Sequence, residues 1–402
     1  MEEWKEYKAK DFCQNVTDGT HDSPKPKEKG YHLITSKHLK ESGIDFSSAY
    51  LISEDDYLKV IARSKVEQYD ILYSMIGTIG NMVQVKTDNV NFAVKNMGIF
   101  KMGKDHLLSS WLFYWLKSPL AHEYVQQRLA GSTQSYLTLN ALREFPVLYP
   151  GDDIAKKIVS ILKSLDDKIE VNRQINDNLE QQAQALFKFW FVDFEPFRDK
   201  PFVESELGMI PEGWRVGSIY EYIDVIYGAP YKSSLFNNQK NGLPLIRIRD
   251  LKTNSPQFYT PEVLPTTEYI ESGDVVAGMV AEFLPYTGMG EREVLNQRCC
   301  KFKGKDNSIS NYFILFLVKS ELEFVQSYKT GTTVSHLGKS DIDRFKVITP
   351  PKNIVLDFSN KVNSMKEEVV NRAKESRRLA ELRDTLLPRL MSGEIKVGDV
   401  TL

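Results

Sequence analysis

The sequence predicts a mixed α/β chain in which two globular domains are separated by two long antiparallel coiled-coil helices, arranged as a pseudo-two-fold internal repeat. Two observations lead to this fold class. First, the stretch GSTQSYLTLNALREFPVLYP returns 200 residues later as GTTVSHLGKSDIDRFKVITP, with seven identities and no gap. Second, each copy is followed by a segment whose apolar residues recur at alternating spacings of four and three, the pattern of a coiled coil.

The repeat divides the chain into four segments. Residues 1–150 and 201–350 are the two predicted globular domains, and residues 151–200 and 351–402 are the helical segments that follow them. Because each domain is followed by its own helix, we expect the chain to be a fused pseudo-dimer.

Both domains contain short runs of β-forming residues. Runs such as YDILYSMI and LPLIRIRDL alternate with turn residues and predict a mixed sheet in each domain. In the internal repeat, Gly19 of the first domain corresponds to Gly228 of the second. Arg247 and Arg249 lie two residues apart in LPLIRIRDL, so we expect them to share one face of a strand.

A helix is expected after the strands of each domain. In the first domain it is SSWLFYWLKSPLAHEYVQQRLAG, in which serines at the start are suited to capping and Gly131 is suited to ending the helix. In the second domain it is SISNYFILFLVKSELEFVQSYKTG, which ends at Gly331.

The helical segments carry the coiled-coil pattern. The first predicted helix extends from Asp152 to Trp190, and the second occupies the corresponding stretch 200 residues later. Polar residues lie in the middle of both apolar stripes, so antiparallel pairing would match polar to polar and apolar to apolar. Two unrelated amphipathic helices, each packed on its own domain, are the alternative. The predicted seam consists of Ile158, Leu162, Leu165, Ile169, Asn172, Asn176, Leu179, Leu186, Val362, Met365, Val369, Arg372, Ser376, Leu379 and Leu386.

Composition narrows the function classes. The 402 residues include 52 Lys+Arg and 54 Asp+Glu without a strongly basic segment, so the chain is not expected to hold nucleic acid by charge alone. No apolar run approaches the roughly 20 residues that span a bilayer. The start MEEWKEYK has no signal-peptide core, so we expect a cytoplasmic location and no membrane partner. Three cysteines, two of them adjacent, fit neither a disulfide framework nor a zinc site.

The sequence contains no recognisable catalytic constellation. The stretch GTTVSHLGKS resembles the end of a phosphate-binding loop, but six residues separate its glycines where that loop has four. HExxH and GxSxG motifs are absent, as is the glycine-rich loop with an aromatic motif that a DNA methyltransferase uses. We therefore expect no catalytic residue, metal or cofactor in this chain.

Polar loop residues suited to DNA recur at matched places in both domains. Arg, Lys, Asn and Gln make directed hydrogen bonds to base edges, whereas Ser, Thr and backbone N–H groups suit phosphates. Taken singly, each is most often an ordinary loop residue, and only the recurrence favours a DNA-binding role. The candidates are Gly19, Thr20, His21, Ser23, Lys37, Ser74, Thr78, Lys95, Asn96, Ser132, Thr133, Gln134, Lys232, Ser233, Ser234, Arg247, Arg249, Asn296, Gln297, Arg298, Thr332 and Thr333.

Over nearly its whole length the sequence resembles a type I restriction-modification specificity subunit. The resemblance rests on DGTHDSP, YDILYSMIGTIG, KIVSILKSLDDKIEVNRQINDNLE, PEGWRVGSI and LRDTLLPRLMSGEIKV. It implies that the two domains are target recognition domains for an asymmetric bipartite target in double-stranded DNA. It also implies that the long helices space these domains and dock two methyltransferase (modification) subunits.

The resemblance further assigns the cofactors to partners. S-adenosylmethionine would belong to the methyltransferase subunits, and ATP and Mg²⁺ to a restriction subunit. This chain would then be a non-catalytic subunit of a type I adenine DNA methyltransferase and restriction endonuclease complex. Two other classes stay open: a stand-alone DNA enzyme, which would need a cofactor site, and a duplicated scaffold protein on a coiled coil that does not bind DNA.

Overall fold

The computed structural model describes residues 4–40, 42–131, 135–329 and 335–400. The chain divides into two compact units. Unit 1 comprises Met1–Glu170 and Leu379–Leu402, and unit 2 comprises Val171–Arg378. Each unit therefore includes part of both long helices.

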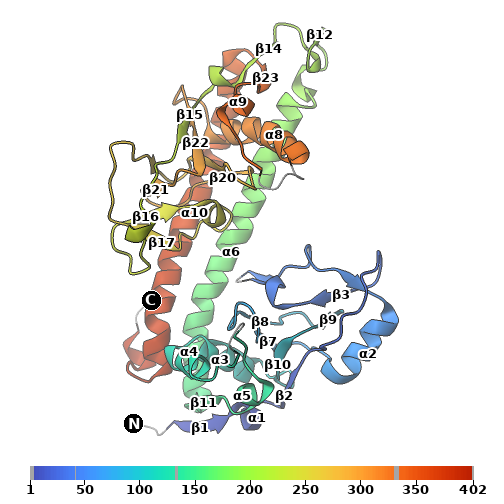
Figure 1. The fold of residues 1–402 in the computed structure, drawn as a ribbon, viewed down its shortest axis with the longest axis vertical. Helices are drawn as coiled ribbons and strands as arrows, with labels where there is room; N and C mark the ends of the chain where they lie inside the picture. Colours follow the sequence, from blue (N-terminus) through green and yellow to red (C-terminus); the bar gives the residue numbers. More distant parts are fainter. Residues whose placement is uncertain (1–3, 41, 132–134, 330–334, 401–402) are drawn as a thin grey trace. The chain divides into compact units, whose positions relative to one another are not determined.

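Unit 1 is made of short strands and helices (Figure 1). In chain order its elements before the long helix are β1 (Lys5–Lys8), α1 (Ala9–Phe12), β2 (Asn15–Asp18), β3 (Tyr31–Ile34), η1 (Ser36–His38), β4 (Leu39–Lys40), β5 (Gly43–Ile44), β6 (Leu51–Ile52), α2 (Glu54–Ser64), β7 (Ile71–Ser74), β8 (Met82–Gln84), β9 (Phe92–Val94), β10 (Met97–Lys101), α3 (His106–Leu116), α4 (Pro119–Gln126), α5 (Leu139–Arg143) and β11 (Pro146–Tyr149).

These strands form two principal sheets. The larger has the order β2-β10-β7-β8, with all neighbours antiparallel. The smaller has the order β6-β3-β9, in which β3 is antiparallel to β6 and parallel to β9. Strands β1 and β11 form a separate antiparallel pair. The mixed α/β character predicted from the sequence is confirmed.

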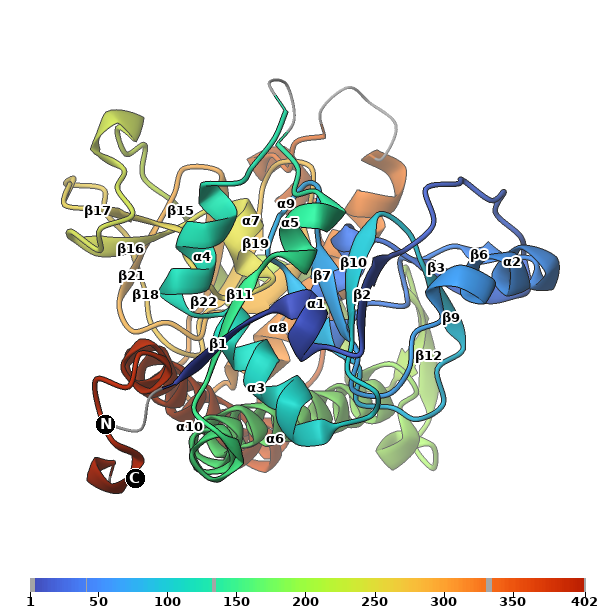
Figure 2. The same ribbon diagram turned by 90° about the horizontal axis from the view of Figure 1, so that it is seen from below.

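The core of unit 1 forms on α3, which is strongly apolar. Trp111 and Trp115 are buried, and their indole N–H groups donate to the carbonyls of Leu148 and Pro146 at 2.8 Å and 2.6 Å. Both rings are thus buried without leaving a donor unpaired. A smaller cluster joins α2 to β9 through Val60, and Figure 2 shows these two elements side by side.

The single helix predicted over residues 109–131 is in fact two helices. Ser118 caps α4, and Pro119 occupies the first turn of that helix. Proline has no N–H to give to a preceding turn, so the helix stops before it and a new one begins. The predicted serine cap of the first helix is also wrong, because Asp105 caps α3. Helix α4 ends before Gly131.

Unit 2 contains a second set of short strands and helices. Between the long helices they are η2 (Glu195–Phe197), β12 (Phe202–Ser205), β13 (Gly208–Pro211), β14 (Arg215–Ser218), η3 (Ile219–Glu221), β15 (Ile223–Tyr227), η4 (Ser233–Leu235), β16 (Leu243–Ile246), α7 (Ile248–Leu251), β17 (Phe258–Thr260), β18 (Tyr269–Ile270), β19 (Val275–Gly278), β20 (Pro285–Thr287), β21 (Glu293–Leu295), β22 (Cys299–Gly304), α8 (Asn311–Lys329), α9 (Lys339–Ile342) and β23 (Lys346–Thr349).

The topology of unit 1 recurs in unit 2. The sheet β15-β22-β19-β20 has the strand order and antiparallel pairing of β2-β10-β7-β8. In the sheet β17-β16-β21-β18, β16 is parallel to β21 as β3 is to β9. Strands β14 and β23 pair as β1 and β11 do. The internal repeat therefore extends from the sequence to the strand order.

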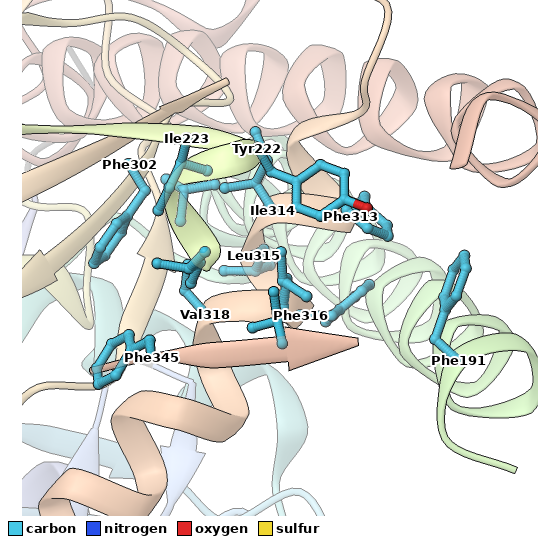
Figure 3. Close-up of a cluster of buried hydrophobic side chains, with 14 of the residues drawn as sticks. Phe191, Tyr222, Ile223, Phe302, Phe313, Ile314, Leu315, Phe316, Val318 and Phe345 are labelled. Carbon is cyan, nitrogen blue, oxygen red and sulfur yellow. The ribbon is translucent and has the colours of Figure 1, made fainter. Parts of the chain in front are cut away.

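The core of unit 2 gathers around α8 (Figure 3). Phe313 and Val318 of this helix are buried together with Phe302 of β22. Phe191 and Phe358, which belong to the long helices, enter the same cluster. The ends of the long helices that lie in unit 2 are thus part of its hydrophobic core.

The long helices are α6 (Asp152–Phe191) and α10 (Lys352–Met391). Every residue of the predicted seam is buried or half-buried. In unit 1, Arg383 of α10 donates to Asp166 of α6 at 2.7 Å, and the hydroxyl of Tyr114 donates to the same carboxylate at 2.8 Å. The helices are thus held together by polar contacts as well as by the apolar stripe.

In unit 2 the polar residues in the middle of the seam form hydrogen bonds from one long helix to the other. Asn172 has no exposed surface; it donates to Glu375 at 2.7 Å and accepts from Arg372 at 3.1 Å. Asn176 donates to the carbonyl of Val369 at 3.2 Å. Partner numbers fall along α10 as they rise along α6, so the pairing is antiparallel, as predicted.

The structure also places the cysteines. Cys13, Cys299 and Cys300 are buried free thiols, and burial raises the pKa of Cys299 to about 12.

Within the described part of the chain, no helix combines the length and apolar character needed to cross a membrane.

Candidate nucleic-acid interface

Two loops of unit 1 meet where β2 and β9 end. The N–H of Thr20 donates to the carbonyl of Val94 at 3.0 Å, and the N–H of Asn96 donates back to the carbonyl of Thr20 at 3.1 Å. Gly19 permits this approach, because a Cβ at that position would lie 2.4 Å from the carbonyl oxygen of Val94. The residues after β2 and after β9 therefore form one continuous surface.

The side chains of this surface are linked by hydrogen bonds. His21 lies between two acceptors, with Nε2 at 3.0 Å from Asp18 Oδ2 and Nδ1 at 2.9 Å from Asn96 Oδ1. Asp18 is buried and also forms an ion pair with Arg63 of α2. On the same surface, Lys95 donates a hydrogen bond to Ser23. The structure thus brings these two predicted candidates together with His21 and Asn96.

The same backbone arrangement recurs in unit 2 after β15 and β21. The N–H of Ala229 donates to the carbonyl of Leu295 at 2.9 Å. A Cβ at Gly228 would lie 2.0 Å from the carbonyl oxygen of Asn296. The exposed side chains that follow on this loop are those of Gln297 and Arg298.

A second pair of matched positions follows β3 and β16. Nδ1 of His38 accepts the N–H of Thr35 at 2.9 Å, and the carboxylate of Asp250 accepts the N–H of Arg247 at 3.1 Å. Burial lowers the pKa of His38, which favours the neutral ring that this acceptor role requires. These hydrogen bonds cap the short helices η1 and α7. Each helix carries one exposed basic side chain, Lys37 on η1 and Arg249 on α7.

The expectation that Arg247 and Arg249 share one strand face is wrong. Strand β16 ends at Ile246, so Arg247 caps α7 and Arg249 lies inside it. Arg247 is half-buried, with Nε 3.1 Å from Asp250 Oδ2 and its guanidinium 4.3 Å from the ring centroid of Phe258. Arg247 is therefore held by contacts within unit 2, whereas Arg249 is exposed.

The remaining candidates differ in exposure. Ser74 is fully buried and donates to the carbonyl of Ile76 at 3.0 Å, so its hydroxyl is not presented at the surface. Gly19 is buried and contributes only through its backbone. The exposed candidates elsewhere in the two units are Thr78, Lys232, Ser233 and Ser234. Outside the described residues lie Ser132, Thr133, Gln134, Thr332 and Thr333.

Arg63 is the residue of this surface that sequence reasoning missed. It is 45 positions from Asp18 in the chain. Its local sequence, VIARSK, resembles the solvent-facing side of any short amphipathic helix. Only the packing of α2 against β9 brings the guanidinium to the carboxylate, so no local signal could have identified it.

A buried carboxylate precedes the unit 2 loop. Glu293 of β21 is 3% exposed, and its burial raises its pKa to about 7 despite the nearby Arg377. In the unfolded chain the ordinary value is 4.5. Between these two values the unfolded chain has lost the proton that the folded chain retains, so the free energy of unfolding falls as pH rises.

Glu293→Gln is therefore expected to stabilise the protein more at about pH 8 than at about pH 5, by roughly 1–3 kcal/mol. Glutamine has nearly the same shape as the protonated acid, but its amide does not ionise between these two pH values. Urea unfolding at the two pH values measures the difference, with the exposed Glu291→Gln as control. An equal effect of Glu293→Gln at both pH values would contradict the assignment.

Comparison with known proteins agrees with this duplicated architecture. Residues 1–181 and 211–363 match the family described as the type I restriction modification DNA specificity domain. The chain is 31% identical over 318 residues to the type I restriction enzyme MjaIX specificity subunit of Methanocaldococcus jannaschii, covering 74% of this chain and 71% of that protein. It is 24% identical over 468 residues to the HindI specificity subunit of Haemophilus influenzae, covering 98% and 100%.

A solved structure is also similar. The S subunit of a type I restriction-modification system from M. genitalium is 14% identical, with a TM-score of 0.48 and 96% of each chain covered. The family match covers both units, and the M. jannaschii relative is similar over most of the chain. The chain belongs to the type I restriction-modification specificity family.

Proposed function

We propose that this chain reads an asymmetric bipartite DNA target as the specificity subunit of a type I restriction-modification complex. The observation that carries the proposal is the backbone arrangement shared by the two units, which presents different side chains at matched positions. His21 of unit 1 corresponds to Pro230 of unit 2, and Lys95 corresponds to Asn296. Different side chains on one backbone arrangement are suited to two different half-sites.

Partner subunits supply the rest of the activity in this proposal. The chain has 52 Lys+Arg against 54 Asp+Glu, so much of the phosphate neutralisation falls to two methyltransferase subunits. These subunits bind S-adenosylmethionine, and a restriction subunit binds ATP and Mg²⁺. The hairpin of β12 and β13 exposes Val203, Leu207 and Met209, an apolar surface that supports docking of a partner protein.

The proposal predicts that substitutions in one unit affect one half-site only. Lys95→Ala is expected to weaken methylation through one half-site, and Arg298→Ala through the other, at about 1–3 kcal/mol for each lost base contact. The test is single-molecule sequencing of methylated adenines in cells that express the complex. Lys5→Ala, at an exposed lysine of β1, is the control. A single uninterrupted motif in the wild-type methylome would refute the bipartite proposal.

A further inference from the structure

His21 has two hydrogen-bond partners. One can only accept a hydrogen bond, and the other can either accept or donate one. The carboxylate of Asp18 can only accept, so Nε2 of the ring must carry a proton to make its 3.0 Å contact. The Asn96 amide, 2.9 Å from Nδ1, has an oxygen that accepts and an NH₂ group that donates. The orientation of Asn96 therefore depends on whether Nδ1 also carries a proton.

Each protonation state of His21 selects one orientation. When both ring nitrogens are protonated, Nδ1 donates and Asn96 turns Oδ1 toward the ring, as in the structure. When only Nε2 is protonated, Nδ1 accepts, and the Asn96 amide must reverse to donate to it. The end of the amide that faces away from the ring is then NH₂ in the first state and oxygen in the second.

The free end of Asn96 is available to a ligand. Asn96 is half-buried, and the His21 side chain is 65% exposed. Among the residues that the structure describes, the amide has no second side-chain partner. The charged groups around the ring are Asp18 of β2, Arg63 of α2, and Lys95, which is held by Ser23; Asp22 follows His21 in the chain.

We infer that His21 is a positioning residue that sets the hydrogen-bond polarity with which Asn96 meets a base of the first half-site. This inference rests on the proposed function. An NH₂ group directed into the major groove selects a base edge that accepts, such as O6 and N7 of guanine. A carbonyl oxygen there selects an edge that donates, such as N4 of cytosine. The base preference at one position should therefore change with the protonation of His21.

The test uses the assembled complex and duplexes with a constant second half-site. Each position of the first half-site is varied, and kcat/KM for methylation is measured at a lower and a higher pH, about pH 6 and about pH 8. At one position the preference for guanine over cytosine is expected to fall roughly tenfold from the lower to the higher pH. Ratios between duplexes remove any pH dependence that the methyltransferase subunits contribute equally to all sequences.

Substitutions separate positioning from folding. His21→Phe keeps a ring but no nitrogen, so it should abolish the pH dependence of the preference and lower the discrimination at that position roughly tenfold. Asn96→Ala should have the same effect, and the double variant no further effect. His32→Phe, the same change at a half-buried histidine of β3, should preserve the preference and its pH dependence.

Two outcomes would overturn the inference while leaving the proposed function standing. One is a bipartite target whose base preferences in His21→Phe keep the wild-type pH dependence. The other is an equal loss of methylation at every position, which would mean that His21 only supports the fold. If the wild-type complex methylates no bipartite target at all, the proposed function itself fails.

Discussion

Replacing Phe358 with alanine is expected to lower the free energy of unfolding by about 3–5 kcal/mol. The ring has no exposed surface, and its centroid lies 5.1 Å from that of Phe191 and 6.2 Å from that of Phe313. Figure 3 shows the side chains of Phe191 and Phe313 in this cluster. Truncation would remove buried apolar area and leave a cavity lined by aromatic rings that cannot collapse into it.

Urea unfolding followed by tryptophan fluorescence measures this loss. Phe324→Ala is the matched control, because that ring is also in unit 2 but is 67% exposed. The control is expected to change the free energy of unfolding by no more than about 0.5 kcal/mol. Equal effects of the two substitutions would show that the cluster around Phe358 does not form the core of unit 2.

Gly19→Ala is expected to impair one half-site of the target and to destabilise unit 1. The new methyl group would lie 2.4 Å from the carbonyl oxygen of Val94, so the loop that carries Lys95 and Asn96 must move away. Overpacking of this kind costs about 1–3 kcal/mol. Because the loop is displaced, methylation through the first half-site should fall at least roughly tenfold, while base preferences in the second half-site persist.

Gly228→Ala should have the corresponding effect on unit 2. Its methyl group would lie 2.0 Å from the carbonyl oxygen of Asn296, so the second half-site should be the one impaired. Gly398→Ala is the control, since a Cβ there meets nothing within 4 Å. It also reports the stabilisation that any such change contributes through the unfolded chain. Methylome mapping and urea unfolding measure both effects, and impairment of the same half-site by both variants would contradict the assignment of one unit to each half-site.

Many residues of the candidate surface could be predicted from the sequence, because matched residues occur in both copies of the repeat. Gly19 and Gly228 are matched in the sequence, and both turn out to be positions where a Cβ would meet a backbone carbonyl. Matched loops then drew attention to Lys95 and Asn96. The boundaries of the four predicted segments, and the roles of the loop residues in DNA contact, stay predictions.

Two elements were predicted wrongly, because in each a helix-capping residue outweighed the local hydrophobic pattern. LPLIRIRDL alternates like a strand, but Asp250 accepts the N–H of Arg247 and begins a helix there. The apolar run at residues 109–131 is periodic throughout, yet Ser118 and Pro119 divide it. A capping serine followed by proline is a local signal that should have outweighed the periodicity.

The sequence by itself determined the two-fold repeat, the mixed α/β class and the antiparallel pairing of the long helices. These features depend on the spacing of side chains along the chain, and spacing is read directly from sequence. Only the tertiary structure decided that Ser74 is buried and that Arg63 reaches Asp18 across 45 positions. Burial and long-range ion pairs depend on which distant segments pack together, and that packing is set by the cooperative burial of whole element faces, which no local stretch of sequence encodes.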